Sequence, residues 1–83
     1  MPEIAILYRL YPSQGYNVDK LSEELKHEAG AIKTEIEEIG FGIQVIKTLF
    51  KYDDSKMSSS DIEIKIQKIK GIEQIEVLEE SLI

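Results

Sequence analysis

Apolar and polar residues alternate along residues 3–11, where Ile4, Ile6, Tyr8 and Leu10 fall on one side. A period of two predicts a β-strand. The opposite side also carries apolar residues, so we expect this strand to lie in the middle of a sheet, covered at least in part on both faces. The sequence Pro-Ser-Gln-Gly at residues 12–15 predicts a loop after it.

A helix is predicted over residues 18–29. Val18, Leu21 and Leu25 form an apolar stripe with helical spacing. Asn17 is a suitable N-cap, because its side-chain oxygen can accept hydrogen bonds from the first amides of the helix. Gly30 is the residue expected just after the end of the helix.

Two further strands are predicted, over residues 32–39 and 43–52, with a glycine-rich turn between them. Gly40 and Gly42 flank Phe41 in this turn. Glycine suits positions with positive φ or close approach of a foreign surface. Phe41 is therefore either a plug tucked back into the core or a side chain displayed to a partner, and a simple β-turn without function is the third interpretation.

The segment around residues 62–69 fits two periods. Ile62, Ile64 and Ile66 alternate as in a strand, whereas Ile62, Ile66 and Ile69 follow a helical stripe. Ser-Asp-Ile-Glu at residues 60–63 matches a capping box and favours a helix over residues 61–70. Gly71 provides the stop.

A last strand is predicted from residue 72, with pairing that ends near Leu78. Residues 79–83 are then expected to form a short terminal segment. The resulting order, β-α-β-β-α-β, is typical of the ferredoxin-like α+β sandwich, in which a four-stranded antiparallel sheet carries two helices on one face. We expect residues 1–83 to form a single domain.

Composition narrows the possible functions. The chain of 83 residues has no cysteine, which excludes disulfides, thiolate metal sites and a thiol nucleophile. A net charge of −6, with Arg9 as the one arginine, argues against direct binding to nucleic acid. No apolar run approaches the ~20 residues of a membrane span, and residues 1–3 do not begin a signal peptide, so we expect a cytoplasmic protein without a membrane partner.

No catalytic set is apparent. His27, between Lys26 and Glu28, falls off the apolar stripe and lacks an orienting partner. The acidic residues Asp53, Asp54 and Asp61 do not have the spacing of a calcium loop, so no metal site is expected. The acidic residues Glu35, Glu37 and Glu38 are interpreted as the solvated side of a strand. No phosphate-binding loop is present, so we expect no cofactor and no nucleotide held by the chain itself.

These residues resemble the elongation factor 1-beta family, the guanine-nucleotide exchange factors for elongation factor 1-alpha. The Gly-Phe-Gly turn resembles the family's segment between the second and third strands. Residues 71–77, Gly-Ile-Glu-Gln-Ile-Glu-Val, are similar to the start of the last strand in archaeal members. The resemblance implies a guanine-nucleotide exchange domain that binds the GTPase elongation factor 1-alpha and speeds GDP release without covalent chemistry. The partner-binding residues that it implies are Gly40, Phe41, Gly42, Ile43, Ser81, Leu82 and Ile83.

One feature departs from the family pattern. In eukaryotic members a Lys next to the C-terminus approaches the magnesium and phosphate end of the nucleotide site, whereas Leu82 is penultimate here and no Lys follows Lys70. GDP would then have to be displaced by Leu82, Ile83, the acidic residues 79–80 or the terminal carboxylate. The alternatives are an ACT-like module that binds a small regulatory ligand and a purely structural adaptor.

Overall fold

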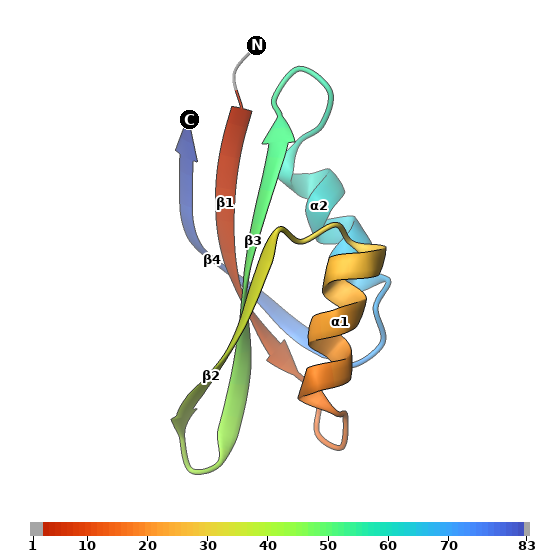
Figure 1. Cartoon of the computed structure of the whole chain (residues 1–83), viewed down its shortest axis with the longest axis vertical. Coiled ribbons are helices and arrows are strands. Elements are labelled where there is room, and N and C mark those ends of the chain that lie inside the picture. Colours follow the sequence, from red (N-terminus) through yellow and green to blue (C-terminus); the bar gives the residue numbers. More distant parts are fainter. Residues whose placement is uncertain (1–2, 83) are drawn as a thin grey trace.

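The computed structural model describes residues 3–82. Its strands are β1 (Glu3–Pro12), β2 (Lys33–Gly40), β3 (Ile43–Asp53) and β4 (Ile72–Leu82), and its helices are α1 (Val18–Glu28) and α2 (Ser59–Gln67). The strands form one antiparallel sheet in the order β2-β3-β1-β4, and both helices lie on the same face of it (Figure 1). The predicted ferredoxin-like arrangement is confirmed.

The core lies between the sheet and the helices. Strand β1 alternates as predicted: Ile6, Tyr8 and Leu10 are fully buried and face the helices. The ring of Tyr8 meets that of Phe50 edge to face, with centroids 5.8 Å apart. The helices and the other strands complete this cluster with Leu21, Leu25, Ile46, Ile62 and Ile66.

Helix α1 is bounded as the sequence predicts. The Asn17 side chain accepts hydrogen bonds from the backbone amides of Asp19 and Lys20, at 2.9 and 3.3 Å. Gly30 follows the cap with a φ of +80°, a conformation that favours glycine. Neither described helix is long and apolar enough to cross a membrane.

Helix α2 is confirmed, but its predicted bounds and capping box were wrong. The N-cap is Ser58 rather than Ser60, and the helix ends at Gln67 rather than near Lys70. The Asp61 carboxylate accepts the Ser58 amide at 2.9 Å and the Ser58 hydroxyl at 3.3 Å. Three consecutive serines offered equivalent caps, and an Asp reaches back to an N-cap as well as a Glu does.

The predicted end of strand pairing near Leu78 was also wrong. Strand β4 pairs with β1 as far as Leu82, which lies opposite Ile4. A β-bulge between the Val77 and Glu79 pairings inserts Leu78 as an extra residue. The bulge shifts by one residue which side chains face the helices. Residues 79–82, whose polar sequence suggested a terminal tail, therefore continue β4 as an edge strand.

Candidate partner-binding site

The turn between β2 and β3 displays Phe41 to solvent. Gly40 pairs with Ile43, and the two residues between them have positive φ values, +54° for Phe41 and +73° for Gly42. Two consecutive residues with positive φ are characteristic of the tight type I′ hairpin turn. The relative exposure of Phe41 is 105%, so the interpretation as a core plug is wrong.

The conformation of Phe41 is costly for a residue with a side chain. A left-handed backbone costs a non-glycine residue about 1–2 kcal/mol, and nothing in the core compensates for it here. Ile39 and Ile43, on either side of the turn, are each about half exposed, at 47% and 51%. With Phe41 they place three exposed large apolar side chains at the end of the hairpin.

A groove of about 480 Å³ lies between this turn and the β1–α1 loop. The loop is held by the chain that enters β4: the Ser13 amide donates to the Gly71 carbonyl at 2.6 Å, and the Tyr16 ring packs on Gly71. Sequence reasoning missed this groove, because its walls come from segments far apart in the chain. The residues lining it are Pro12, Ser13, Gln14, Tyr16, Val18, Phe41, Gly42, Ile43, Gln44 and Glu73.

The C-terminal site residues lie at the opposite end of the sheet (Figure 1). Ser81 and Leu82 pair with Ala5 and Ile4, and Ile4 also pairs with Tyr52 on β3. Tyr52 is nine residues along β3 from Ile43, which at 3.3 Å per residue is roughly 30 Å. The molecule is 42 Å long, so the structure does not bring the two predicted groups together.

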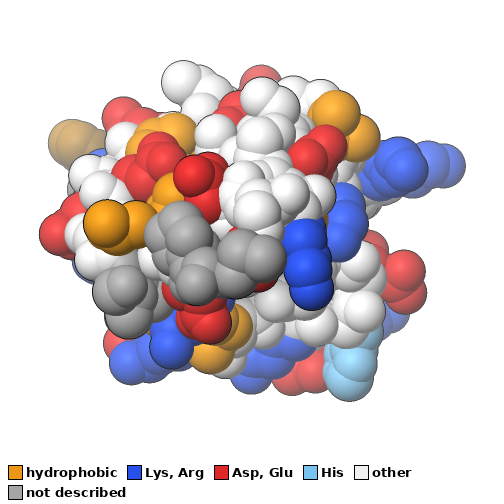
Figure 2. All heavy atoms as spheres, turned by 90° about the horizontal axis from the view of Figure 1, so that it is seen from above, with side chains coloured by type: hydrophobic (Ala, Val, Ile, Leu, Met, Phe, Trp, Pro, Cys, Tyr) orange, Lys and Arg blue, Asp and Glu red, His pale blue; other side chains and the backbone are white. Residues whose placement is uncertain are grey.

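The end carrying the C-terminal residues is both acidic and apolar. Leu82 is 73% exposed, although its backbone is paired in the sheet. Glu80 points toward the helix side, where its carboxylate accepts the Tyr52 hydroxyl at 3.2 Å. Figure 2 looks onto this end and shows acidic, hydrophobic and basic side chains exposed there. Ile83, the last predicted site residue, lies outside the described residues.

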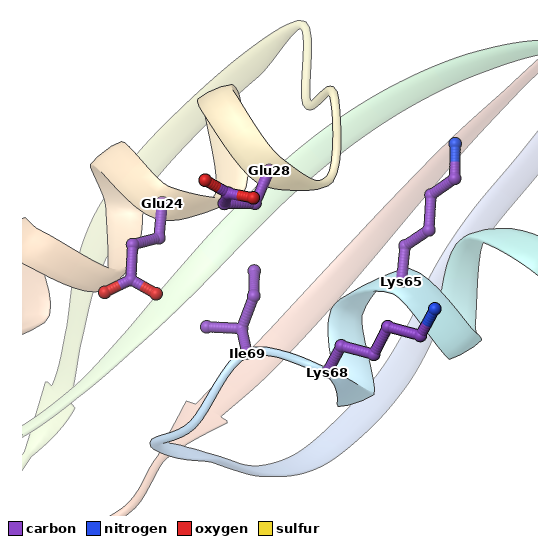
Figure 3. A pocket seen from close by; sticks show the side chains of 5 residues that line it. All are labelled: Glu24, Glu28, Lys65, Lys68 and Ile69. Atoms are coloured by element: carbon purple, nitrogen blue, oxygen red, sulfur yellow. The ribbon is translucent and has the colours of Figure 1, made fainter.

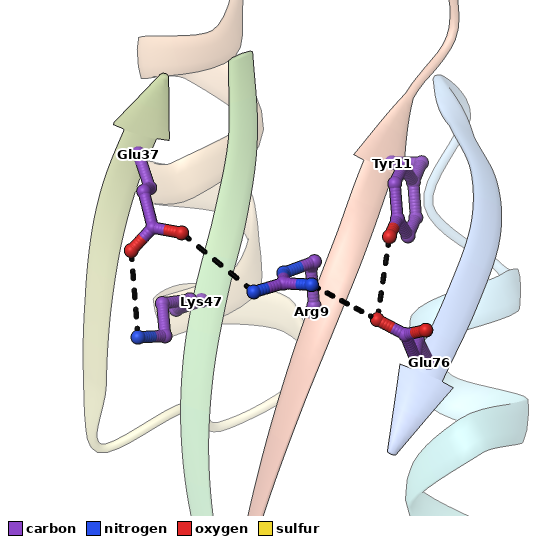
Figure 4. Close-up of polar contacts among 5 residues, drawn as sticks. All are labelled: Arg9, Tyr11, Glu37, Lys47 and Glu76. Atoms are coloured by element: carbon purple, nitrogen blue, oxygen red, sulfur yellow. Dashed lines mark hydrogen bonds and ion pairs between the residues drawn. The ribbon is translucent and has the colours of Figure 1, made fainter. Parts of the chain in front are cut away.

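The face of the sheet opposite the helices carries a network of charges across all four strands (Figure 4). Arg9 pairs with Glu76 at 3.3 Å and with Glu37 at 3.7 Å, and Lys47 pairs with Glu37 at 3.4 Å. The Tyr11 hydroxyl also donates to Glu76 at 3.3 Å. Glu37 is therefore more than a solvated carboxylate, since it bridges two cations from neighbouring strands.

The side chains of His27 and Asp53, considered for acid–base chemistry or metal binding, make local contacts with neighbouring side chains and backbone. The His27 side chain is 77% exposed and lies 3.5 Å from the Glu23 carboxylate one helical turn away. Asp53 accepts the Ser55 hydroxyl and amide, at 2.7 and 2.9 Å, and these hydrogen bonds hold the pKa of its carboxyl below the usual value. Within residues 3–82 no group of three or more His, Asp or Glu side chains could hold a metal ion.

A second hollow, also of about 480 Å³, opens between the two helices (Figure 3). Glu24 and Glu28 come from α1, whereas Lys65 comes from α2 and Lys68 and Ile69 follow it. The hollow thus sets two carboxylates against two ammonium groups over one apolar side chain. Because the hollow holds charges of both signs, it has neither a cluster of like charge that would attract an ion nor a pair of groups suited to proton transfer.

Comparison with known proteins decides the family. Residues 6–83 match the model of the EF-1 guanine nucleotide exchange domain. The chain belongs to the elongation factor 1-beta family. It is 33% identical to an elongation factor 1-beta from Pyrobaculum arsenaticum over 76 residues, covering 84% of this chain and 83% of the relative. It is 31% identical to one from Methanoregula boonei over 80 residues, covering 95% and 94%. The archaeal type predicted from the sequence is confirmed, and the ACT-like alternative is left without support.

Proposed function

We propose that this protein accelerates the release of GDP from elongation factor 1-alpha during translation, which places it in the cytoplasm. Family membership supports the class of activity, and the displayed Phe41 supports a mechanism based on binding. An exchange factor needs no catalytic residue. It needs only to bind the nucleotide-free GTPase more tightly than the GDP complex, because linkage then makes the factor and GDP weaken each other by the same ratio.

The Phe41 turn is the proposed anchor on the GTPase. The Phe41 ring is fully exposed on a two-residue loop between paired strands, so few backbone dihedrals remain to be ordered when a partner covers it. A buried aromatic anchor of this kind contributes ~2 kcal/mol or more to an interface. Gly40 and Gly42 add the positive φ values that project Phe41 outward, and they leave the turn without side chains that would obstruct an approaching surface.

The other end of the sheet is the proposed point of action on the nucleotide. The paired backbone of β4 holds Ser81 and Leu82 in place, and Leu82 projects from the helix side of the sheet edge. Glu79 lies opposite Leu7 on the open face, so a carboxylate accompanies Leu82 at this end. A carboxylate near bound phosphate repels it, and one near magnesium competes for the metal. These groups replace the lysine of the eukaryotic relatives.

The roughly 30 Å between the two ends sets the geometry of the complex. Because the sheet that joins them is continuous, anchoring at Phe41 fixes where the Leu82 end falls on the partner. A GTPase that contacts both ends must present two surfaces with this separation. The Phe41 end then binds the GTPase, and the Leu82 end displaces GDP.

The differential-binding mechanism is tested by measuring one affinity in two states of the GTPase. Calorimetry with elongation factor 1-alpha should give a Kd for the nucleotide-free form about 100-fold or more below that for the GDP complex, equivalent to about 2.7 kcal/mol. Equal affinities for the two forms would exclude the mechanism, since a ligand without differential affinity shifts no equilibrium.

A further inference from the structure

The groove beside Phe41 has one charged group. Its apolar surface comes from Pro12, Val18 and Ile43 and from the rings of Tyr16 and Phe41. Its neutral polar groups belong to Ser13, Gln14 and Gln44, and Glu73 is the single charged side chain among the residues that line it. A channel with apolar and neutral polar walls and a carboxylate at one position is suited to a side chain with an aliphatic stem and a positive tip.

The Glu73 carboxylate is available to a partner. Glu73 is exposed, and no residue in the described range 3–82 forms an ion pair with it. Glu38, opposite Gln44 on the neighbouring strand, adds a second negative charge near the groove. Lys70 lies close in sequence but lines a separate hollow with Tyr16 and Lys20. Glu73 is therefore the one formal charge on the groove's own lining.

We propose that this groove receives an arginine or lysine side chain of the GTPase. The aliphatic stem lies along Ile43 and the aromatic rings of Tyr16 and Phe41, and the cationic head faces Glu73. The rings also attract the cation through their π faces. An apolar occupant would remove Glu73 from water without a partner, which is unfavourable, and an acidic one would be repelled. The inference rests on the proposed function and adds the chemistry of the partner at the anchoring end.

Charge reversal at the groove tests the proposal. The affinity of the Glu73→Lys variant for nucleotide-free elongation factor 1-alpha is compared with that of Glu28→Lys, which makes the same change in net charge. Glu28 ends α1, ten residues or about 15 Å from Val18 at the groove. We expect Glu73→Lys to raise the Kd about tenfold or more, and Glu28→Lys to leave it within about twofold. Both positions are exposed, and circular dichroism confirms that each variant is folded.

A neutral variant provides a second readout. Glu73→Gln keeps the size of the side chain and removes the charge, so its Kd should depend less on salt concentration than the wild-type Kd does. GDP release at saturating factor should stay at the wild-type rate, because the groove contributes to binding rather than displacement. Equal loss of affinity in both reversed variants, or none in Glu73→Lys, would overturn the groove assignment. If the wild-type chain itself fails to bind the GTPase, the proposed function fails first.

Discussion

The ring of Tyr16 lies against the α-carbon of Gly71: a β-carbon at residue 71 would come within 2.6 Å of the Tyr16 Cδ1 atom. Gly71 also has a φ of +102°, which a residue with a side chain adopts only under strain. The glycine that opens the family-like run at residues 71–77 thus has two physical reasons to be glycine. It permits the turn into β4 and lets Tyr16 form one wall of the groove beside Phe41.

Replacing Gly71 should destabilise the fold more than replacing Gly15. Gly15→Ala meets only the conformational cost of a positive φ, about 1–2 kcal/mol, because nothing lies within 4 Å of the added β-carbon. Gly71→Ala adds overpacking against Tyr16, a further ~1–3 kcal/mol. Urea unfolding of both variants measures the difference.

A double variant separates the two causes at residue 71. Tyr16→Ala should cost less stability in the Gly71→Ala background than in the wild type, because it removes the clash that Gly71→Ala creates. Equal losses for Gly71→Ala and Gly15→Ala, with no coupling to Tyr16, would show that the contact with the Tyr16 ring carries no energy.

Removing the Phe41 ring should affect partner binding and spare the fold. Because Phe41 is fully exposed, Phe41→Ala should change the free energy of unfolding by no more than about 0.5 kcal/mol. The same change should weaken binding to elongation factor 1-alpha by ~2 kcal/mol or more. Ile64→Ala, on the exposed side of α2, is the matched control and should leave binding unchanged.

Asparagine at the same position gives a sharper result. Asn-Gly is the preferred sequence for a turn with two positive φ values, so Phe41→Asn should stabilise the hairpin by about 1 kcal/mol while still weakening the complex. A variant that is more stable but binds less well indicates that the strain at Phe41 serves the interface. Stabilisation with unchanged affinity would remove Phe41 from the binding surface.

The C-terminal residues should control the rate of release rather than affinity. Deleting residues 81–83 removes the last pairings of β4, opposite Ala5 and Ile4, and leaves the Phe41 end intact. Binding should persist while GDP release at saturating factor slows. Leu82→Lys should alter the release rate and its magnesium dependence, since it introduces a positive charge where the eukaryotic relatives carry one. An unchanged rate in the truncated protein would assign displacement to the hairpin end.

Stability should decrease in alkali through Tyr8. Burial, reinforced by the nearby Glu63 carboxylate, raises the pKa of Tyr8 well above its usual value near 10. The folded chain then keeps a proton that the unfolded chain releases, so the stabilisation is complete below pH ~10 and is lost as pH rises above it. Urea unfolding from pH 9 to 11 should show a smaller decrease for Tyr8→Phe than for the wild type, and identical decreases would contradict this assignment.

Local sequence signals predicted the elements, but long-range packing set their limits. Any serine from 58 to 60 could have capped α2. The structure uses Ser58, and a fully buried Tyr8 directs its hydroxyl toward the Ser59 carbonyl, 3.4 Å away, in the first turn of the helix. The Leu78 bulge leaves no local signature, because an edge strand tolerates polar residues on both faces.

The candidate site likewise has a part that local sequence predicts and a part that only the folded chain creates. Gly-Phe-Gly is a contiguous pattern, so the turn at Phe41 could be predicted from turn chemistry and its place at a partner surface from the family resemblance. The choice between a core plug and a displayed ring needed the exposure of Phe41 in the structure. The groove beside this turn could not be predicted, because Tyr16, Ile43 and Glu73 come together only when the sheet has formed. The sequence also gave no measure of the distance between the Phe41 turn and Leu82, which depends on the register of β1 with both of its neighbours.

Release of a fluorescent GDP analogue from elongation factor 1-alpha, followed by stopped flow with increasing amounts of this protein, tests the central claim most directly. The release rate should rise with factor concentration and saturate about tenfold or more above the spontaneous rate. The factor weakens GDP binding through linkage, and a loss of affinity appears mostly as faster dissociation. A rate that stays at the spontaneous value while the two proteins form a complex would contradict the exchange function.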